Sequence, residues 1–303
     1  MIDAHIHCFP PEISNDVHAW AKQYNEPHWL QLVAPVGKKS LQGWASMETT
    51  LKSMDRAGIE KSILLGWYWE HKKTCIRQNE LMHTWLERAP DRFIGFASIF
   101  PQENPIDQLE RAKAMGFRGV GELHPRLQEY SKYKSEWQIL ADWCSREHWP
   151  INLHVTEGLN HSYDAYIPTP FDDYLELAIR FPDLRIILAH WGGGIPFYEQ
   201  NPRIKAALKN VYYDTAASPL LYSMDIFKNM VNLVGPNKLI FGSDFPLRLF
   251  PQKTDAPNME NFIDAIKAIG MSEETQAALF KNTICSVLDQ MPVNSSAQSK
   301  KSS

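Results

Sequence analysis

The sequence is short of cysteine, of long apolar runs and of basic charge, and each shortage excludes a class of protein. Its four cysteines are scattered and form no Cys-x-x-Cys spacing, which excludes a small disulfide scaffold and favours reduced thiols in a cytoplasmic protein. No apolar run reaches the length of about 18 residues that a membrane span needs, so we expect no membrane association. The formal net charge of −4 offers no basic patch, so we expect no nucleic-acid partner.

The composition that is present fits a large globular protein. The 303 residues are 44% hydrophobic and 22% charged, which is close to the average of globular domains. A closed barrel of alternating strands and helices takes about 250 residues. The length therefore allows one such barrel or two ordinary domains.

The first seven residues contain the most informative motif, Asp3-Ala4-His5-Ile6-His7. Side chains alternate between the two faces of a strand, so His5 and His7 are predicted to point the same way. Two adjacent imidazoles can bind one divalent cation such as zinc. Three later apolar runs also carry a possible ligand at or near their ends: His154 in Ile151–Val155, His190 in Ile186–Gly194 and Asp244 in Leu239–Pro246.

Eight strand-like runs alternate with amphipathic helix-like runs, a pattern that indicates βα units and a parallel sheet. The predicted strands are Ile2–His7, Lys61–Gly66, Phe93–Ile99, Gly119–Leu123, Ile151–Val155, Arg185–His190, Val211–Asp214 and Leu239–Ser243. Eight is the number that closes an α/β barrel of the (β/α)8 TIM type, whose active site lies at the carboxyl ends of the strands. We therefore predict a single-domain TIM barrel over residues 1–290, followed by a disordered, polar tail over residues 291–303.

One connection is much longer than an ordinary βα loop of a few residues. The segment Phe9–Trp44 leaves the carboxyl end of the first strand and contains Trp20, Trp29 and Trp44. Because it starts on the catalytic face, it could form a wall or lid above the site. It could equally be a small helical pad on the edge of the barrel, and the sequence does not decide between these two roles.

The motifs together resemble the amidohydrolase-related family (amidohydrolase 2) of metal-dependent TIM barrels, in the branch around aminocarboxymuconate-semialdehyde decarboxylase. The matching segments occur in family order: Asp3–His7, Asp91–Ala97, Gly119–Pro125, Leu153-His154, Phe181–Gly193 and Phe241–Pro246. They cover nearly the whole chain and are specific as a set, but they identify no substrate.

The resemblance implies roles for the residues that match. The metal ligands are expected to be His5, His7, His154 and Asp244, with Asp244 also accepting a proton from metal-bound water. His190 is expected to act as an acid or base beside the metal, although the same position binds a second ion in two-metal relatives. The expected cofactor is a divalent ion, zinc with manganese as the alternative, and one ion is favoured over two; a homodimer is the expected assembly. Elementary chemistry agrees, since a divalent ion lowers the pKa of bound water to about 7 and neighbouring carboxylate and imidazole groups can move protons.

Four further residues are candidates with open alternatives. Glu122 stands where many relatives have lysine or a small residue, and could ligate a metal or hydrogen-bond a metal-bound histidine. His124 could line the pocket or only turn the chain, and Trp191 could form a pocket wall or pack in the core. Arg248, four residues after Asp244, could bind a substrate carboxylate in a two-pronged contact or be a solvated loop charge.

Two classes of function follow from these residues. The first is an enzyme that acts on a small carboxylated or ring-bearing molecule, either as a hydrolase of a lactone, amide or ester or as a non-oxidative decarboxylase of an aromatic or muconate-like acid. The same residues serve both reactions, and the sequence reading prefers the hydrolase. The second class is a catalytically silent barrel that only binds a ligand. The complete set of expected ligands argues against it.

Overall fold

The computed structural model describes residues 1–158 and 165–289, and eight parallel strands form its centre. They pair in sequence order, β1 to β8, as the sequence predicted. Their bounds are β1 Ile2–Ile6, β2 Lys61–Leu65, β3 Phe93–Ala97, β4 Gly119–Leu123, β5 Ile151–Leu153, β6 Ile186–Leu188, β7 Val211–Asp214 and β8 Leu239–Ile240. Several strands end earlier than expected, so that His7, His154 and His190 lie just beyond a strand rather than within one, and Asp244 follows β8 as expected.

The sheet closes on itself because the chain around β8 hydrogen-bonds to β1. The Ala4 amide donates to the Phe241 carbonyl at 2.8 Å, and the His7 amide donates to the Phe245 carbonyl at 2.7 Å. The Asp244 amide in turn donates to the His5 carbonyl at 2.8 Å. These bonds confirm the predicted (β/α)8 barrel and place the first and last strands side by side.

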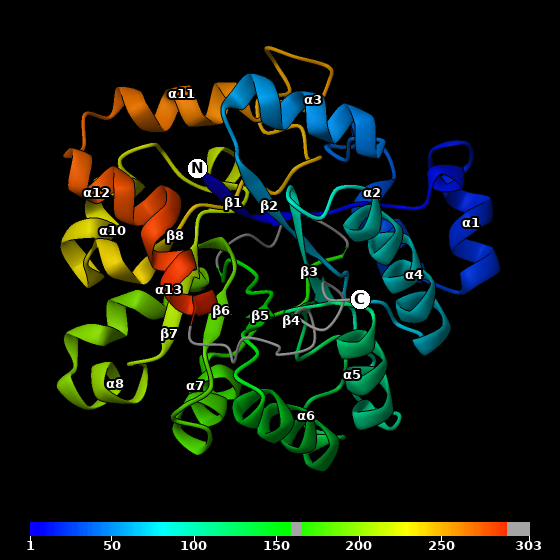
Figure 1. The fold of residues 1–303 in the computed structure, drawn as a ribbon, viewed down its shortest axis with the longest axis horizontal. Coiled ribbons are helices and arrows are strands. Elements are labelled where there is room, and N and C mark those ends of the chain that lie inside the picture. The colour runs from blue at the N-terminus through cyan, green and yellow to red at the C-terminus, as the bar shows by residue number, and fades with distance from the viewer. Residues whose placement is uncertain (159–164, 290–303) are drawn as a thin grey trace, which may run out of the picture.

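Helices surround the ring of strands (Figure 1). Their bounds are α1 Val17–Tyr24, α2 Pro27–Val33, α3 Met47–Ala57, α4 Lys72–Arg88, α5 Pro105–Ala114, α6 Lys134–Arg146, α7 Phe171–Arg180, α8 Pro202–Ala207, α9 Ser218–Leu221, α10 Ile226–Val234, α11 Glu260–Ala268, α12 Glu273–Ala277 and α13 Thr283–Asp289. Helix α3 shows the local rules: Ser46 caps its first turn by accepting from the Thr49 amide, and Gly58 ends it with a φ of 69°.

Two apolar layers hold the barrel together. The larger lies between strands and surrounding helices and includes Leu64, Leu109 and Trp137. The second gathers Ile2, Ile63, Phe96, Ile187 and Ile240 from five strands around Ile284 and Val287 of α13. Since one helix contacts strands from different parts of the ring, α13 closes the end of the barrel opposite the carboxyl ends of the strands.

The insertion after β1 folds as a short 3-10 turn, Pro11–Ser14, followed by α1 and α2. Its aromatic side chains form a separate cluster in which Phe9, Trp20 and Trp29 pack against Trp69 from the loop after β2. Trp29 is almost fully buried, so this part of the insertion is a packed helical pad. The rest of the insertion has a different role, which becomes visible at the site.

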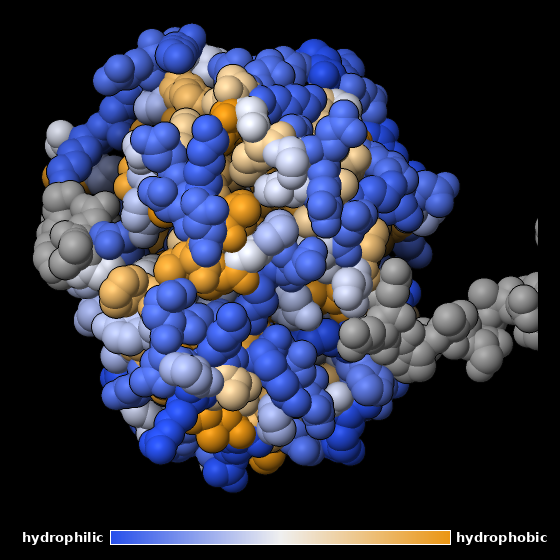
Figure 2. Space-filling view, turned by 90° about the vertical axis from the view of Figure 1, so that its left-hand side faces the viewer, coloured by the Kyte–Doolittle hydropathy of each residue, from blue (hydrophilic) through white to orange (hydrophobic). Residues whose placement is uncertain are grey.

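The surface carries only a few exposed large apolar side chains. Viewed from the side on which α8 and α10 lie, apolar residues form patches between hydrophilic ones (Figure 2). Ile179, Phe197 and Tyr198 are among the exposed ones. Within the described residues, no helix is both long and apolar enough to cross a bilayer. The tail over residues 291–303 lies outside the described residues, so its expected disorder and the domain boundary at residue 290 stay predictions.

The apolar interior of the barrel generates a stability prediction for Phe96→Ala. Phe96 is fully buried, and its ring fills the space beside Gly119, where a β-carbon would lie 2.7 Å from it. Removing the ring should lower the free energy of unfolding by about 3–5 kcal/mol, measured by urea denaturation. Phe197→Ala is the matched control, since Phe197 is 68% exposed and its loss should cost about 0.5 kcal/mol or less. Equal costs would contradict this account of the core.

Candidate metal centre

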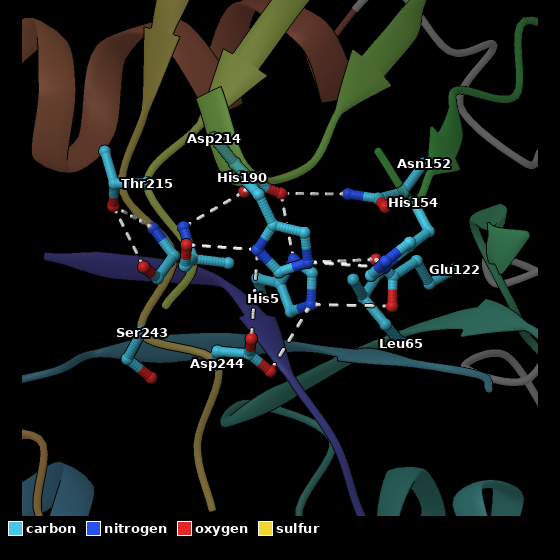
Figure 3. A network of polar contacts seen from close by, with 12 residues as sticks. His5, Leu65, Glu122, Asn152, His154, His190, Asp214, Thr215, Ser243 and Asp244 are labelled. Carbon is cyan, nitrogen blue, oxygen red and sulfur yellow. Dashed lines mark hydrogen bonds and ion pairs between the residues drawn. The ribbon is translucent and has the colours of Figure 1, made fainter. Parts of the chain in front are cut away.

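The carboxyl ends of the strands bring a group of histidines and carboxylates together (Figure 3). This follows from the barrel, because all eight parallel strands end at the same face. The contributing residues are His5 from β1, His7 just after β1, Glu122 from β4, His154 after β5, His190 after β6, Asp214 from β7 and Asp244 after β8. All are buried except His154, which is partly exposed.

Four side chains enclose one point in space. The Nε2 atoms of His5 and His7 lie 3.2 Å apart, and each faces Asp244 Oδ1, at 3.8 and 3.6 Å. Glu122 Oε2 completes the group, 3.9 Å from His5 Nε2 and 3.7 Å from His7 Nε2. Ligands bonded at about 2.0–2.2 Å to a tetrahedral ion lie about 3.3–3.6 Å from one another. The His5, His7 and Asp244 atoms are therefore spaced much as the ligands of one small divalent cation, and Glu122 Oε2 lies beside the two imidazoles.

A second group lies on the other side of Glu122. Glu122 Oε1 is 2.8 Å from His154 Nδ1 and 3.6 Å from His190 Nε2, and these two imidazole nitrogens are 3.3 Å apart. The expected ligand set is thus divided: His5, His7 and Asp244 form one group, whereas His154 belongs to the other. The two oxygens of Glu122 face one group each, which places this glutamate between them.

Contacts behind the histidines fix which nitrogen faces the site. Nδ1 of His5 lies 2.9 Å from Asp214 Oδ2, and Nδ1 of His7 lies 3.1 Å from the Leu65 carbonyl oxygen. Because these acceptors hold a proton on Nδ1, the Nε2 atoms present lone pairs to the site, as metal ligands require. The Asn152 amide also donates to Asp214 Oδ2 at 3.1 Å.

Asp214 is a residue that sequence reasoning missed. Its Oδ2 holds His5, and its Oδ1 accepts the backbone amides of His190 and Ala216 at 3.1 and 3.0 Å. One carboxylate therefore joins the first strand to the loop that carries His190. The signal was available, since Asp214 ends the predicted seventh strand in the same way that Asp244 follows the eighth.

The carboxylates make the centre strongly negative. Burial by itself lowers the pKa of His5, but Asp214, Asp244 and Glu122 outweigh burial and raise that pKa to about 10. Burial and the positive charge of His5 lower the pKa of His7 to about 4. Burial by itself raises the pKa of Glu122. The neighbouring His154 opposes this effect and contributes to a pKa well below the usual range of a glutamate. The three carboxylates therefore favour a positive charge at the centre, as the raised pKa of His5 shows.

A divalent metal ion fits this donor set. Within residues 1–158 and 165–289, no lysine or arginine forms an ion pair with Glu122, Asp214 or Asp244, whose charged partners are all histidines. Buried charges that lack such partners are stable when they coordinate a metal. Imidazole nitrogens and carboxylate oxygens are ligands of zinc and of other divalent first-row metals.

The loops that carry the site have an unfavourable backbone conformation. His190, Trp191 and Asp244 have φ values of 56°, 58° and 64°, a left-handed region that costs non-glycine residues energy and occurs often at functional sites. Gly193 follows with a φ of 54°, and a β-carbon there would lie 2.7 Å from Val155. The glycines after Trp191 therefore allow the loop to pass close to the end of β5.

A cavity of about 360 Å³ lies above the two groups. His7, Glu122, His154, His190 and Asp244 form its polar floor. Its walls are largely apolar and include Leu32, Val33, Pro35 and Leu41 of the insertion, together with Leu220, Leu221 and Leu247. The insertion thus serves both purposes considered from the sequence: α1 is part of a packed pad, and residues 31–42 form a wall of the cavity.

The three expected substrate-binding residues do not line this cavity among the described residues. His124 is buried and stacks on His154 with ring centroids 5.1 Å apart. The Trp191 indole N–H donates to Ser218 Oγ at 2.8 Å, and its ring packs against Phe227. The Arg248 guanidinium donates to the Ser40 carbonyl of the insertion. These three side chains therefore contact residues around the cavity and do not form its inner surface.

Comparison with known proteins finds one family model that matches the chain. The model, described as amidohydrolase, covers residues 2–288. A 6-methylsalicylic acid decarboxylase from Penicillium expansum is 23% identical over an alignment 326 residues long, gaps included, that covers 91% of this chain and 92% of that protein.

Solved structures share the fold at low sequence identity. A 5-carboxyvanillate decarboxylase from Novosphingobium aromaticivorans, in complex with manganese and 4-hydroxy-3-methoxy-5-nitrobenzoic acid, has a TM-score of 0.69 at 15% identity, with 95% of each chain covered. A probable 2-pyrone-4,6-dicarboxylic acid hydrolase from Acinetobacter baumannii, with citric acid bound, has a TM-score of 0.62 at 16% identity, with 95% of this chain and 98% of that chain covered.

The donor geometry predicts that the group of His5, His7 and Asp244 holds the metal. Replacing both histidines in His5→Ala/His7→Ala should reduce bound divalent metal from about one equivalent to a small fraction, because two of four ligands are lost. Elemental analysis of protein purified in parallel measures the change. His18→Ala is the control, since His18 is exposed on α1 and its loss should leave the metal content unchanged. Equal metal content in all three proteins would refute the assignment.

Proposed function

From the premise that the chain belongs to the amidohydrolase family, we propose that it is a metal-dependent decarboxylase of a hydroxylated aromatic acid. One observation carries the proposal: His5, His7 and Asp244 are spaced as ligands of one cation at the floor of an apolar cavity, with Glu122 and His190 beside them. A floor that binds a carboxylate through a cation, under walls that accept a ring, suits an aromatic acid.

The comparisons support decarboxylation better than the hydrolysis that the sequence reading preferred. The 6-methylsalicylic acid decarboxylase matches nearly its whole length to this chain, and the 5-carboxyvanillate decarboxylase shares the fold with a manganese ion bound. The probable hydrolase shares the same fold to a similar degree, so hydrolysis remains the second candidate. A silent barrel is disfavoured, because every expected metal-binding side chain is present and faces the site.

The bound ion would be held by His5, His7, Asp244 and Glu122. Its chemistry there is that of a Lewis acid, which binds and polarises substrate oxygens. The first two ligands are oriented by Asp214 and the Leu65 carbonyl, so that their Nε2 atoms remain directed at the same point. The apolar walls exclude water from the ring of the substrate and strengthen the electrostatic interactions at the floor.

His190 is placed to deliver the proton that the reaction needs. Its Nδ1 lies 3.1 Å from the Ala216 carbonyl oxygen, which fixes the ring, and its Nε2 faces the cavity floor near Glu122. In decarboxylation a proton joins the ring carbon that bears the carboxylate. The bond from that carbon to the carboxyl carbon then breaks, its electron pair stays in the ring and carbon dioxide leaves. His190 gives the proton and recovers one from solvent.

Asp244 has two functions in this proposal. Its Oδ1 faces His5 and His7 as a ligand, while its Oδ2 lies 4.0 Å from His190 Nδ1. The negative charge beside the imidazole favours the protonated ring that the reaction uses. Asp244 is also the carboxylate that would accept a proton from metal-bound water if the reaction were hydrolysis.

We propose one bound ion, with Glu122 as its fourth ligand. The second group, Glu122, His154 and His190, keeps its imidazoles as proton carriers in this arrangement, although the same atoms could hold a second ion. Two nitrogens and two carboxylate oxygens suit either zinc or manganese. Zinc was expected from the sequence, and manganese is supported by the fold relative that contains it.

The walls favour a ring with one carboxylate and apolar substituents. The side chains of Leu32, Val33, Leu220, Leu221 and Leu247 cover much of the cavity above the floor. A second carboxylate placed against these leucine and valine side chains, rather than beside Lys38 or Lys39, would lose hydration without gaining a partner, which is costly. A methylated hydroxybenzoate should therefore be a better substrate than a dicarboxylated ring.

The homodimer and the cytoplasmic location expected from the sequence stay predictions. Ile179, Phe197 and Tyr198 are exposed apolar side chains that a second copy could cover. They lie outside the cavity, so the proposed chemistry does not depend on a partner.

Two substrate sets separate the candidate reactions. The enzyme should release carbon dioxide from 6-methylsalicylate, and more slowly from 5-carboxyvanillate, without placing heavy oxygen from labelled water into the ring product. It should leave 2-pyrone-4,6-dicarboxylate intact. Mass spectrometry of the products and trapping of carbon dioxide measure both outcomes, with the His5→Ala/His7→Ala protein as the inactive control. A labelled carboxylate formed from the pyrone, without carbon dioxide from either acid, would favour hydrolysis instead.

His190→Ala tests the role of this histidine and the number of ions. Turnover should fall by about 10²–10⁴-fold, the usual contribution of a positioned acid or base, while elemental analysis finds the metal content unchanged. His83→Ala is the matched control, because His83 lies on α4 and contacts the Met115 carbonyl, away from the site. Loss of metal from the His190 variant would show instead that the site holds two ions.

A further inference from the structure

We propose that Arg248 is a positioning residue that clamps the insertion segment Lys38–Gly43 over the cavity and thereby sets the affinity for substrate. The inference rests on the proposed function, since it concerns the wall of the same cavity. It assigns to Arg248 an indirect role in place of direct contact with a substrate carboxylate.

Arg248 holds the segment with both its side chain and its backbone. The guanidinium donates to the Ser40 carbonyl, and the Arg248 amide donates to the Leu41 carbonyl at 2.9 Å. The side chain is only 11% exposed, and its Nη1 atom is 3.9 Å from Asp255 Oδ1. A charged donor on a backbone carbonyl, sheltered from water, is among the stronger hydrogen bonds in proteins.

The clamped segment is held by local hydrogen bonds and by one close backbone contact. Ser40 Oγ donates to the Val33 carbonyl at 2.5 Å and accepts from the Gln42 amide at 3.0 Å. Gly43 ends the segment at a close approach, because a β-carbon there would overlap the Pro246 carbonyl and the Pro257 ring. Both prolines belong to the loop after β8 that also carries Arg248. This loop therefore supports the segment from one side.

The other end of the insertion is fixed independently. Glu26, just before α2, accepts the Glu70 amide on Oε2 at 2.8 Å, and Glu70 Oε1 accepts the His28 amide at 2.7 Å. These reciprocal contacts join α2 to the loop after β2 and do not involve Arg248. Loss of Arg248 should therefore release residues 34–43 while α1 and α2 remain packed.

The segment matters to the site because it forms part of the wall. Lys38, Lys39, Leu41 and Gln42 line the cavity, whereas Arg248 does not. Beneath them the floor carries His7 and Asp244, which Arg248 does not contact among the described residues. The loop after β8 thus contains both Asp244, which is part of the floor, and Arg248, which holds the wall.

Arg248→Met tests the clamp by keeping an unbranched apolar side chain and removing the donor. Tryptic cleavage after Lys38 or Lys39, both exposed, should become about 10-fold faster under native conditions, because the segment opens more often. With a substrate of the proposed class, KM should rise about 5-fold to 10-fold while kcat stays within about 3-fold, as expected when binding alone is weakened. The metal content should not change.

Two variants complete the experiment. Asp255→Asn is the control, because Asp255 is 89% exposed and its ion pairs with Lys39 and Arg248 should contribute little; its cleavage rate and KM should match the wild type. Arg248→Gln is the second test variant: its shorter, neutral side chain removes the charged donor from the Ser40 carbonyl but keeps a polar group, so it should give the same signature. It also decides the matter if Arg248→Met does not fold.

Two results would overturn the proposal. Wild-type cleavage rates in Arg248→Met, or in Arg248→Gln where the first variant does not fold, would show that the clamp does not hold the segment. A loss of kcat without faster cleavage would mean that Arg248 acts on the substrate itself. Proteolysis needs no turnover, so failure of the proposed decarboxylation would leave this test intact.

Discussion

The structure depends on burying three carboxylates, Glu122, Asp214 and Asp244, at one end of a barrel with histidines as their only charged partners among the described residues. Such a group is unstable unless positive charge lies between its members. The carboxylates raise the pKa of His5 to about 10, and a divalent cation satisfies the same demand with two charges. The centre is therefore best understood as a site built around a cation.

Backbone geometry supplies what side-chain chemistry needs. His190 and Asp244 both have positive φ values, and each is held by specific contacts: the His190 amide donates to Asp214, and the Asp244 amide donates to the His5 carbonyl. The hydrogen bonds that close the barrel between β8 and β1 thus also place a ligand. Closure of the fold and assembly of the site are one structural event, which explains why the unfavourable conformations are tolerated.

The loops above the strands decide what the cation acts on. The insertion after β1 and the loop after β8 meet at Arg248 and Gly43, so neighbouring strands in the closed ring carry the two loops that form one wall. Variation in these loops can change the substrate while the floor stays the same, as is general for this barrel. This separation explains why fold relatives with different activities resemble this chain to a similar degree.

The sequence by itself determined the eight strands and the residue types of the site, because period-two apolar runs and polar strand ends are local patterns. It placed His5, His7, His190 and Asp244 at one face for the same reason. It could not show that His154 lies with His190 rather than with His5, that Asp214 orients His5, or that Arg248 points to Ser40, which is 208 residues away in the chain. Those relations depend on how the barrel closes and how two long loops pack, and only the tertiary structure decides distances between residues that no local pattern connects.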